Sequence, residues 1–308
     1  MSTRAGYGMG LLPRDKRRAL GVIHAFASRV DRIADGPLDP VEKLSRLDAQ
    51  ARALTDSAQP DSATHDPLLA ALAHAREAYG LPLDALEQLV EGARMDARGC
   101  SYESFDELLL HCRSTAGSRG RLCVAVCGAR GGERERERAA GLADDLAVAM
   151  RLTDIMRNLR KDAERGRVYV PAEDFRRYHL LGEAATAMSP AAVLVLARAG
   201  RVPEPQALTG LDGGEQAQLY ALLRFQALRA RTWFHRGIEL AGLLDRRGAA
   251  SVLGITAIYR RLLERIEDRP DRALSEVFVL GAPEQAWVAA RGIIRRRGPA
   301  PHPAERLP

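Results

Sequence analysis

Apolar residues recur every three or four positions through most of this chain, which is the spacing of one face of an α-helix. No run alternates apolar and polar residues as a half-buried strand does. The helices predicted from this pattern cover residues 13–35, 39–56, 66–79, 83–95, 104–127, 134–164, 186–200, 214–246, 250–268 and 283–296. The pattern therefore predicts an all-α protein.

The breaks between the predicted helices carry residues that end or begin helices. The first helix ends at Asp35-Gly-Pro, and Asp39 before Pro40 supplies a cap and a first-turn proline for the second. Helices of this length suit one layered bundle rather than two domains. We place this single domain at residues 1–295 and expect the Pro- and Arg-rich residues 296–308 to form a disordered tail.

The composition is that of an ordinary globular protein, with 308 residues, 46% hydrophobic and 28% charged. The net charge is +6, but only three of the 46 basic residues are lysines, which fits a coding bias toward arginine better than a basic face. Aromatic residues make up 5% and do not interleave with a basic run, so we expect no nucleic-acid partner. Without a signal-peptide core or a run of ~20 apolar residues, we expect a cytoplasmic protein.

Four cysteines, Cys100, Cys112, Cys123 and Cys127, could pair or bind a metal. No histidine stands near them at the spacing of a zinc site. We therefore expect buried, reduced thiols, as in a cytoplasmic protein.

Oxygen-bearing side chains are spaced at helical intervals in two places. Asp154, Asn158 and Asp162 lie four residues apart and would form one stripe on a helix, and Asp31 and Asp35 repeat this spacing upstream. One such pair alone usually marks a solvated helix face, but both sets lie in strongly apolar helices. Mg²⁺ takes oxygen ligands and shares them with substrate phosphates. Two facing helices with these side chains predict a prenyl diphosphate site.

Six segments carry a wider pattern: Leu11–Arg17, Phe26–Asp35, Gly92–Asp96, Cys112–Gly120, Leu152–Pro171 and Ile258–Arg260. In this order they resemble the motifs of the squalene/phytoene synthase family, in particular those of bacterial presqualene diphosphate synthases of squalene and hopanoid formation. The resemblance spans about residues 5–295. It implies an isoprenoid synthase helical bundle with a central cavity.

The resemblance also implies an activity and a cofactor. The expected reaction is the Mg²⁺-dependent, head-to-head joining of two prenyl diphosphates with release of pyrophosphate. Two farnesyl diphosphates giving presqualene diphosphate are the expected substrate and product. The matching metal-binding positions are Asp31, Asp35, Asp154, Asn158 and Asp162, of which Asp31, Asp35 and Asp162 are the expected catalytic carboxylates. The expected diphosphate contacts are Arg17, Arg157 and Arg167.

The chain departs from the family pattern at this site. Arg32 and Asn158 stand where the family has Asp, Asp154 where it has Asn, and Arg151 where it has Gln. One carboxylate of the stripe is thereby displaced by one turn, ~5.4 Å. Arg32 and Arg151 could bind diphosphate directly, because arginine matches phosphate with two parallel hydrogen bonds. They could equally pair with Asp35 and Asp154 and block the metal.

Three aromatic or imidazole side chains have two readings each, and a fourth departs from the family. His24 and His111 stand where the family has tyrosine. A hydrogen-bonded core residue is the expected role of His24, although a neutral imidazole could also take a proton from a carbocation. For Tyr169 and Tyr259 packing is expected first, and contact with substrate second.

Two other functions stay open. The same cavity could ionise one prenyl diphosphate to a cyclic or linear terpene, which the altered aspartates and the histidines favour. A catalytically inactive relative could bind a prenyl chain or scaffold another enzyme. No Gly-x-Gly-x-x-Gly element suggests a nicotinamide-binding domain. An apolar product could bring the protein to a membrane surface as a peripheral protein.

Overall fold

The computed structural model describes residues 10–57, 65–99, 101–164, 167–180, 213–274 and 277–295. The first half of the chain forms α2 (Arg14–Asp35), α3 (Pro40–Asp56), α4 (Pro67–Tyr79), α5 (Leu83–Arg98), α6 (Phe105–Cys112), the π-helical turn η1 (Arg113–Gly117) and α7 (Ser118–Cys127). The second half forms α8 (Glu133–Arg157), α9 (Leu159–Glu164), α10 (Ala172–Arg177), α12 (Gly213–Gly237), α13 (Leu240–Leu243), α14 (Arg246–Asp268), the 3₁₀ turn η3 (Pro270–Leu274) and α15 (Ala282–Arg295).

The prediction of an all-α protein is confirmed over these ranges, where no strand forms and the one β-contact is an isolated bridge between Ala129 and Leu244. No helix within them combines the length and the apolar character needed to cross a bilayer. The predicted helix at 186–200 and the predicted tail at 296–308 lie outside the described residues.

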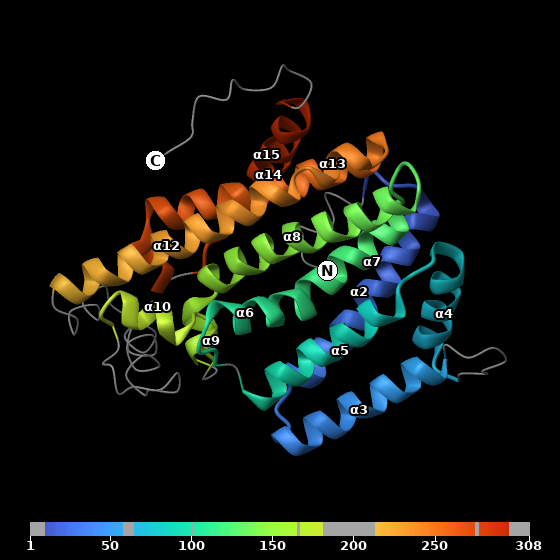
Figure 1. The fold of residues 1–308 in the computed structure, drawn as a ribbon, viewed down its shortest axis with the longest axis horizontal. Helices are drawn as coiled ribbons and strands as arrows, with labels where there is room; N and C mark the ends of the chain where they lie inside the picture. The colour runs from blue at the N-terminus through green and yellow to red at the C-terminus, as the bar shows by residue number, and fades with distance from the viewer. Residues whose placement is uncertain are drawn as a thin grey trace.

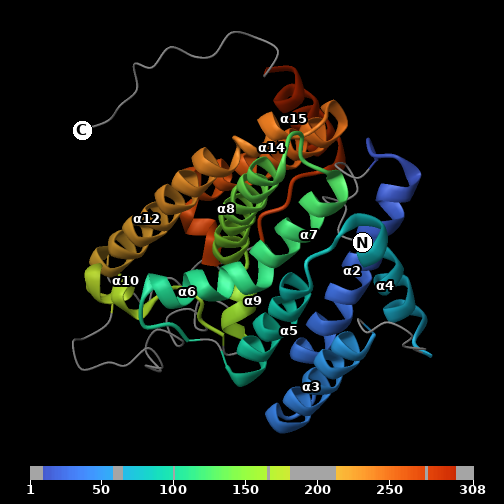
Figure 2. The same ribbon diagram turned by 45° about the vertical axis from the view of Figure 1, so that its right-hand side comes forward.

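Helix α8 runs through the middle of the bundle (Figure 1). It packs against α7 and η1 on one side and against α12 and α14 on the other. Helices α2, α3, α4 and α5 pack together beyond α7, and α15 packs on α14 (Figure 2). One continuous cluster of buried side chains joins these layers and includes Phe26, Met156 and Phe234. Each such side chain contributes about 1.5–3 kcal/mol when it leaves water.

Side-chain caps explain where several helices begin. Asp39 accepts hydrogen bonds from the backbone N–H groups of Val41 and Glu42, at 2.9 and 3.0 Å, and so begins α3 as the sequence predicts. Asp245 accepts from the backbone N–H of Gly248 at 2.7 Å and begins α14. The predicted helix 214–246 is therefore wrong at its end, because α12 stops at 237 and the capped helix starts at 246.

Two other predicted helices contain irregular turns. The predicted helix 104–127 is helical from 105 but widens into a π turn over Arg113–Gly117. The predicted helix 134–164 is interrupted at Asn158, whose φ of −104° and ψ of 9° separate α8 from α9. Both irregular turns lie beside the cavity described next.

Candidate active site

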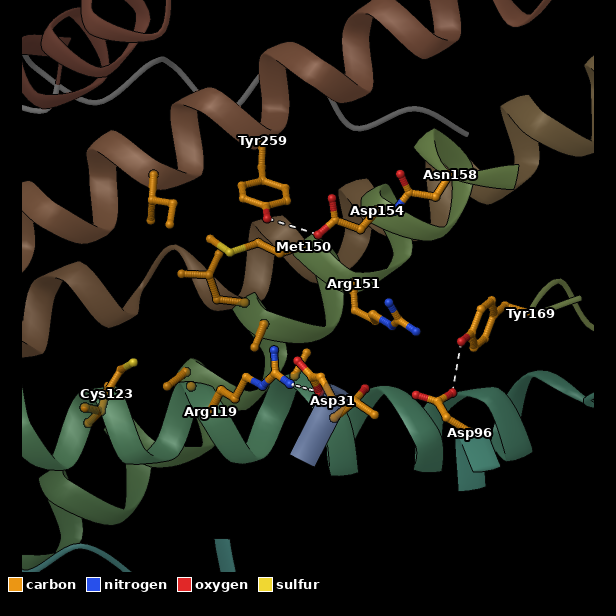
Figure 3. A pocket seen from close by; sticks show the side chains of 18 of the residues that line it. Asp31, Asp96, Arg119, Cys123, Met150, Arg151, Asp154, Asn158, Tyr169 and Tyr259 are labelled. Atoms are coloured by element: carbon orange, nitrogen blue, oxygen red, sulfur yellow. Dashed lines mark hydrogen bonds and ion pairs between the residues drawn. The ribbon is translucent and has the colours of Figure 1, made fainter. Parts of the chain in front are cut away.

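A cavity of about 500 Å³ lies among α2, α5, α7, α8 and α14 (Figure 3). This volume is within the range of small-molecule sites, about 300–1,000 Å³. Carboxylates and cations gather at one end, and apolar side chains line the other. We call these the polar end and the apolar arm.

Asp31 and Asp35 lie one turn apart on α2, and an arginine from elsewhere in the chain holds each of them. Arg119 of α7 donates from Nη2 to Oδ1 of Asp31 at 2.6 Å. Arg167 donates from Nη1 to Oδ1 of Asp35 at 2.5 Å. Burial alone would lower the pKa of Arg167, but interactions with Tyr169 and Asp35 outweigh burial and raise the pKa above its usual value. The guanidinium therefore stays charged.

Asp154, Asn158 and Asp162 line the opposite wall, as the predicted stripe requires. Backbone hydrogen bonds continue across the helix break, from Asn158 N to Asp154 O at 3.0 Å and from Asp162 N to Asn158 O at 2.8 Å. The interruption therefore leaves the three side chains on one wall. Asp154 is held by the Tyr259 hydroxyl, 3.0 Å from Oδ2, and by Arg157 Nη2, 3.1 Å from Oδ1.

Two cations of the polar end, Arg151 and Lys161, form no ion pair with a carboxylate of the described residues. The Arg151 guanidinium lies over the ring of Tyr169, 4.7 Å from its centroid, and points away from Asp154 (Figure 3). Burial alone would lower the pKa of Arg151, but interactions with Tyr169 and Asp96 outweigh burial and raise the pKa above its usual value. A charged donor without a carboxylate partner is well suited to receive an anion.

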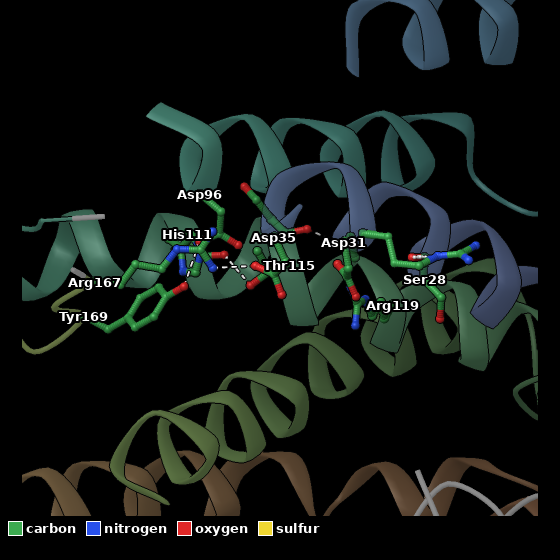
Figure 4. A network of polar contacts seen from close by, with 12 residues as sticks. Ser28, Asp31, Asp35, Asp96, His111, Thr115, Arg119, Arg167 and Tyr169 are labelled. Carbon is green, nitrogen blue, oxygen red and sulfur yellow. Dashed lines mark hydrogen bonds and ion pairs between the residues drawn. The ribbon is translucent and has the colours of Figure 1, made fainter. Parts of the chain in front are cut away.

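Asp96 of α5 gathers a hydrogen-bonded cluster at the polar end (Figure 4). Its Oδ1 accepts from the Tyr169 hydroxyl at 2.9 Å and lies 3.0 Å from Nε2 of His111. Because a carboxylate only accepts, Nε2 carries the proton, and the buried Nδ1 has no hydrogen-bond partner in the described structure. Burial lowers the pKa of His111, although Asp96 opposes the shift, so the imidazole is neutral at pH 7.

The π turn η1 presents Thr115 and Ala116 to the cavity. Thr115 donates from Oγ1 to the carbonyl oxygen of His111 at 2.8 Å. Gly117 lies so close to α8 that a Cβ there would be 2.0 Å from Oδ1 of Asp144. π turns occur inside α-helices mostly as single turns and frequently at functional sites.

The apolar arm is lined by aliphatic and sulfur-containing side chains, among them Val124, Leu146, Met150, Val252 and Ile255. Such walls keep water from a reactive intermediate.

The cysteines meet the sequence-based expectation in part. Cys112 and Cys127 are buried free thiols, as predicted, but Cys123 is exposed to the apolar arm, which corrects the prediction that it is buried. The atoms packed around the thiol raise the pKa of Cys123 to about 12, so it is neutral. Cys100 lies outside the described residues.

Most of the predicted site residues line this cavity, although they come from distant parts of the chain. They are Asp31, Asp35, Arg151, Asp154, Asn158, Asp162, Arg167, Tyr169 and Tyr259. Tyr169 is also a core residue at 4% exposure, and Tyr259 packs against the core, so both fulfil the expectation of packing while lining the cavity.

Four predicted residues lie outside the cavity lining: Arg17, His24, Arg32 and Arg157. Arg17, His24 and Arg32 are exposed on α2, so His24 is not the core residue expected from the sequence. Arg32 donates from Nε to the carbonyl oxygen of Ser28 at 3.2 Å and pairs with no described carboxylate. Arg32 is the residue directly after Asp31, and Arg157 is the residue directly before Asn158. One residue turns a helix by about 100°, so neither arginine shares its neighbour's direction.

Three charged residues of the cavity lining were not predicted: Asp96, Arg119 and Lys161. Asp96 and Arg119 lie in two of the segments that resemble family motifs, so their segments were noted but their roles were not. Lys161 is adjacent to Asp162, and nothing in its spacing marks it.

The all-helical bundle around a cavity with one acidic and cationic end agrees with the isoprenoid synthase fold that the sequence led us to expect. A family model described as squalene/phytoene synthase matches residues 2–283. The chain belongs to the squalene/phytoene synthase family.

The similar proteins carry related names. A phytoene synthase of Mycobacterium tuberculosis is 35% identical over 287 residues, which cover 93% of this chain and 85% of the relative. The 15-cis-phytoene synthase of Synechocystis sp. is 28% identical over 269 residues, covering 84% and 71%.

Two solved structures show the same fold. A dehydrosqualene synthase in complex with ligand superposes with a TM-score of 0.76 at 20% identity, covering 96% of this chain and 92% of that one. A squalene synthase from Alicyclobacillus acidocaldarius gives a TM-score of 0.65 at 20% identity, covering 88% and 100%.

Proposed function

We propose that this protein joins two prenyl diphosphates head to head and releases pyrophosphate. The observation that carries the proposal is the continuity of one cavity from a charged end into an apolar arm. The charged end matches a diphosphate, and the arm matches an isoprenoid chain. Membership of the squalene/phytoene synthase family supports the same reaction class.

The reaction begins with loss of diphosphate from one substrate. The carbon–oxygen bond breaks, and its electron pair leaves with pyrophosphate, which Arg151 and Lys161 are placed to receive. The double bond of the second substrate supplies the electron pair for the new carbon–carbon bond, and one proton is lost as the product forms. Leu146, Met150 and Ile255 keep water from the cation.

The side chains of the polar end fit Mg²⁺ in their chemistry, because Asp31, Asp35, Asp154, Asn158 and Asp162 are all oxygen donors. No group of three metal-ligating side chains stands close together in the described part of the chain. Asp31 and Asp35 are held by arginines instead. We infer that they would exchange arginine for metal when substrate enters. When bound, Mg²⁺ would neutralise charge on the leaving diphosphate.

The substrate length is the finer part of the proposal. The motifs that resemble presqualene diphosphate synthases favour farnesyl diphosphate, with fifteen carbons. The mycobacterial relative named phytoene synthase favours a second candidate, in which two twenty-carbon chains give phytoene. Both products begin with the same head-to-head joining, and phytoene also requires that the second diphosphate leave with its carbon–oxygen electron pair and that a second proton be lost.

Incubation of the purified protein with Mg²⁺ and labelled farnesyl or geranylgeranyl diphosphate tests this function. We expect a product of twice the substrate's carbon number, whose length identifies the preferred substrate. We also expect turnover to stop after chelation and in the Asp162→Ala variant. Hydrocarbon or alcohol of one substrate's length would instead indicate a terpene synthase. Unchanged substrate would indicate an inactive relative, and full turnover after chelation would refute the metal requirement.

A further inference from the structure

Helix α15 is apolar on the side that packs against α14. Val288 and Ala289 are each 8% exposed. Gly292 lies so close to α14 that a Cβ there would be 2.6 Å from the Cβ of Ala257. This contact fixes which side of α15 faces inward.

The outward side of α15 is apolar as well. Its exposed positions are Ala282, Pro283, Ala286, Trp287, Ala290, Arg291 and Ile294, and only Arg291 among them is polar. Trp287 is 59% exposed and Ile294 is 64% exposed. An apolar side of a helix is normally covered by another part of the protein or by a partner. Nothing in the described structure covers this one, so it is suited to an external partner.

Charge around this face has one sign. The Arg291 guanidinium lies 5.0 Å from the centroid of the Trp287 ring, and the sequence continues with Arg295-Arg-Arg. Glu284, the acidic residue of the helix, is held by Arg265 at 2.7 Å. The face therefore combines an aromatic residue, an aliphatic residue and uncompensated arginine.

We propose that the outward face of α15 docks the protein onto an anionic lipid surface. Tryptophan and large aliphatic side chains enter the boundary between head groups and acyl chains, and arginine meets the anionic head groups. A second copy of the chain is a poorer partner, because a two-fold contact would place the arginines of one copy against those of the other. This surface lies outside the cavity, so docking through it is independent of the proposed reaction.

The chain itself provides a reporter for this docking. It has two tryptophans, and Trp233 is only 8% exposed. In the Trp233→Phe variant, fluorescence comes from Trp287 alone. We expect its emission to shift to shorter wavelength with phosphatidylglycerol-containing vesicles, and to shift little with phosphatidylcholine vesicles. Added salt should weaken the response, because it screens the attraction between arginine and lipid.

Vesicle sedimentation of the full-length protein tests the face directly. We expect Trp287→Ser combined with Ile294→Ser to weaken binding to phosphatidylglycerol-containing vesicles by about tenfold or more, since two large apolar side chains are lost. Val41→Ser on α3 is the matched control, because Val41 is 78% exposed on another helix. It should bind like the parent. Unchanged thermal unfolding shows that both variants fold.

Three results would overturn the proposal. The parent could fail to bind anionic vesicles, or the double variant could bind as well as the parent. The double substitution could also abolish a concentration-dependent dimer while leaving vesicle binding intact. This last result would assign the face to contact between copies.

Discussion

Arg119 forms an ion pair with Asp31, a side chain expected to bind metal. We predict that Arg119→Gln raises the affinity for Mg²⁺ alone, because the carboxylate no longer has a cationic partner. The pair is partly exposed, at 37% and 48%, so solvent screens it and the expected gain is about two- to fivefold. Calorimetric titration with MgCl₂ measures it. Arg46→Gln, which removes a surface ion pair to Glu42, is the control. An unchanged affinity would mean that Arg119 does not compete with metal.

His111 makes stability depend on pH. Burial lowers its pKa below the ordinary 6.5, so below that pH the unfolded chain takes up a proton that the folded chain resists. Above about pH 6.5 the imidazole is neutral in both states and the free energy of unfolding is unaffected. As pH falls from 6.5 toward the lowered pKa of the folded protein, the free energy of unfolding decreases. His111→Gln keeps an N–H for Asp96 but cannot titrate. We predict that its urea midpoint falls less than that of the parent between pH 7.5 and 5.5. Equal losses would show that other groups dominate.

At the scale of helices, the sequence predicted elements wherever local chemistry sets their ends. Asp39 with Pro40 and Asp35 with Gly36 mark boundaries by capping and backbone preference, and the structure confirms both. The π turn was not predicted, and the close approach of its Gly117 to Asp144 of α8 is a contact between helices that the local sequence does not reveal. The break at Asn158 was missed because oxygen donors at helical spacing favoured a continuous helix.

The crossing of α7 and α8 sets the cavity wall and gives a prediction for one glycine. A Cβ on Gly120 would lie 2.6 Å from the carbonyl oxygen of Ala143, so the backbones must separate. We predict that Gly120→Ala destabilises the protein by about 1–3 kcal/mol, as overpacking does, and also lowers activity. Gly141→Ala is the matched control, because a Cβ there meets nothing within 4 Å. It should unfold at the parent's urea concentration or slightly above. A parent-like Gly120→Ala variant would show that the helices separate freely.

At the scale of the whole molecule, the sequence predicted the identity of the site residues better than their orientation toward one another. Asp31 and Asp162 come from distant segments, and their family positions and apolar surroundings were enough to bring them into one site. The partners of these carboxylates were not predictable. That Arg119 reaches Asp31 and Arg167 reaches Asp35 depends on the crossing of helices far apart in the chain. Residue direction explains why Arg32 and Arg157, each one position away from a lining residue, are not part of the lining themselves.

The π turn at Arg113–Gly117 also sets the phase between the two helices that it joins. A π turn holds more residues than an α turn over the same rise, so it shifts the register of α7 against α6. Because the extra residue is held within the turn itself, deleting one residue there would leave an ordinary α turn, and the residues that follow would keep their direction. A deletion at Ser118, in the regular helix that follows, would instead rotate Arg119 and Cys123 by about 100° and turn both away from the cavity, while His111 stayed beside Asp96. The π turn therefore tolerates the loss of one residue better than the α-helix after it, where one deleted codon would separate Arg119 from Asp31 without altering either.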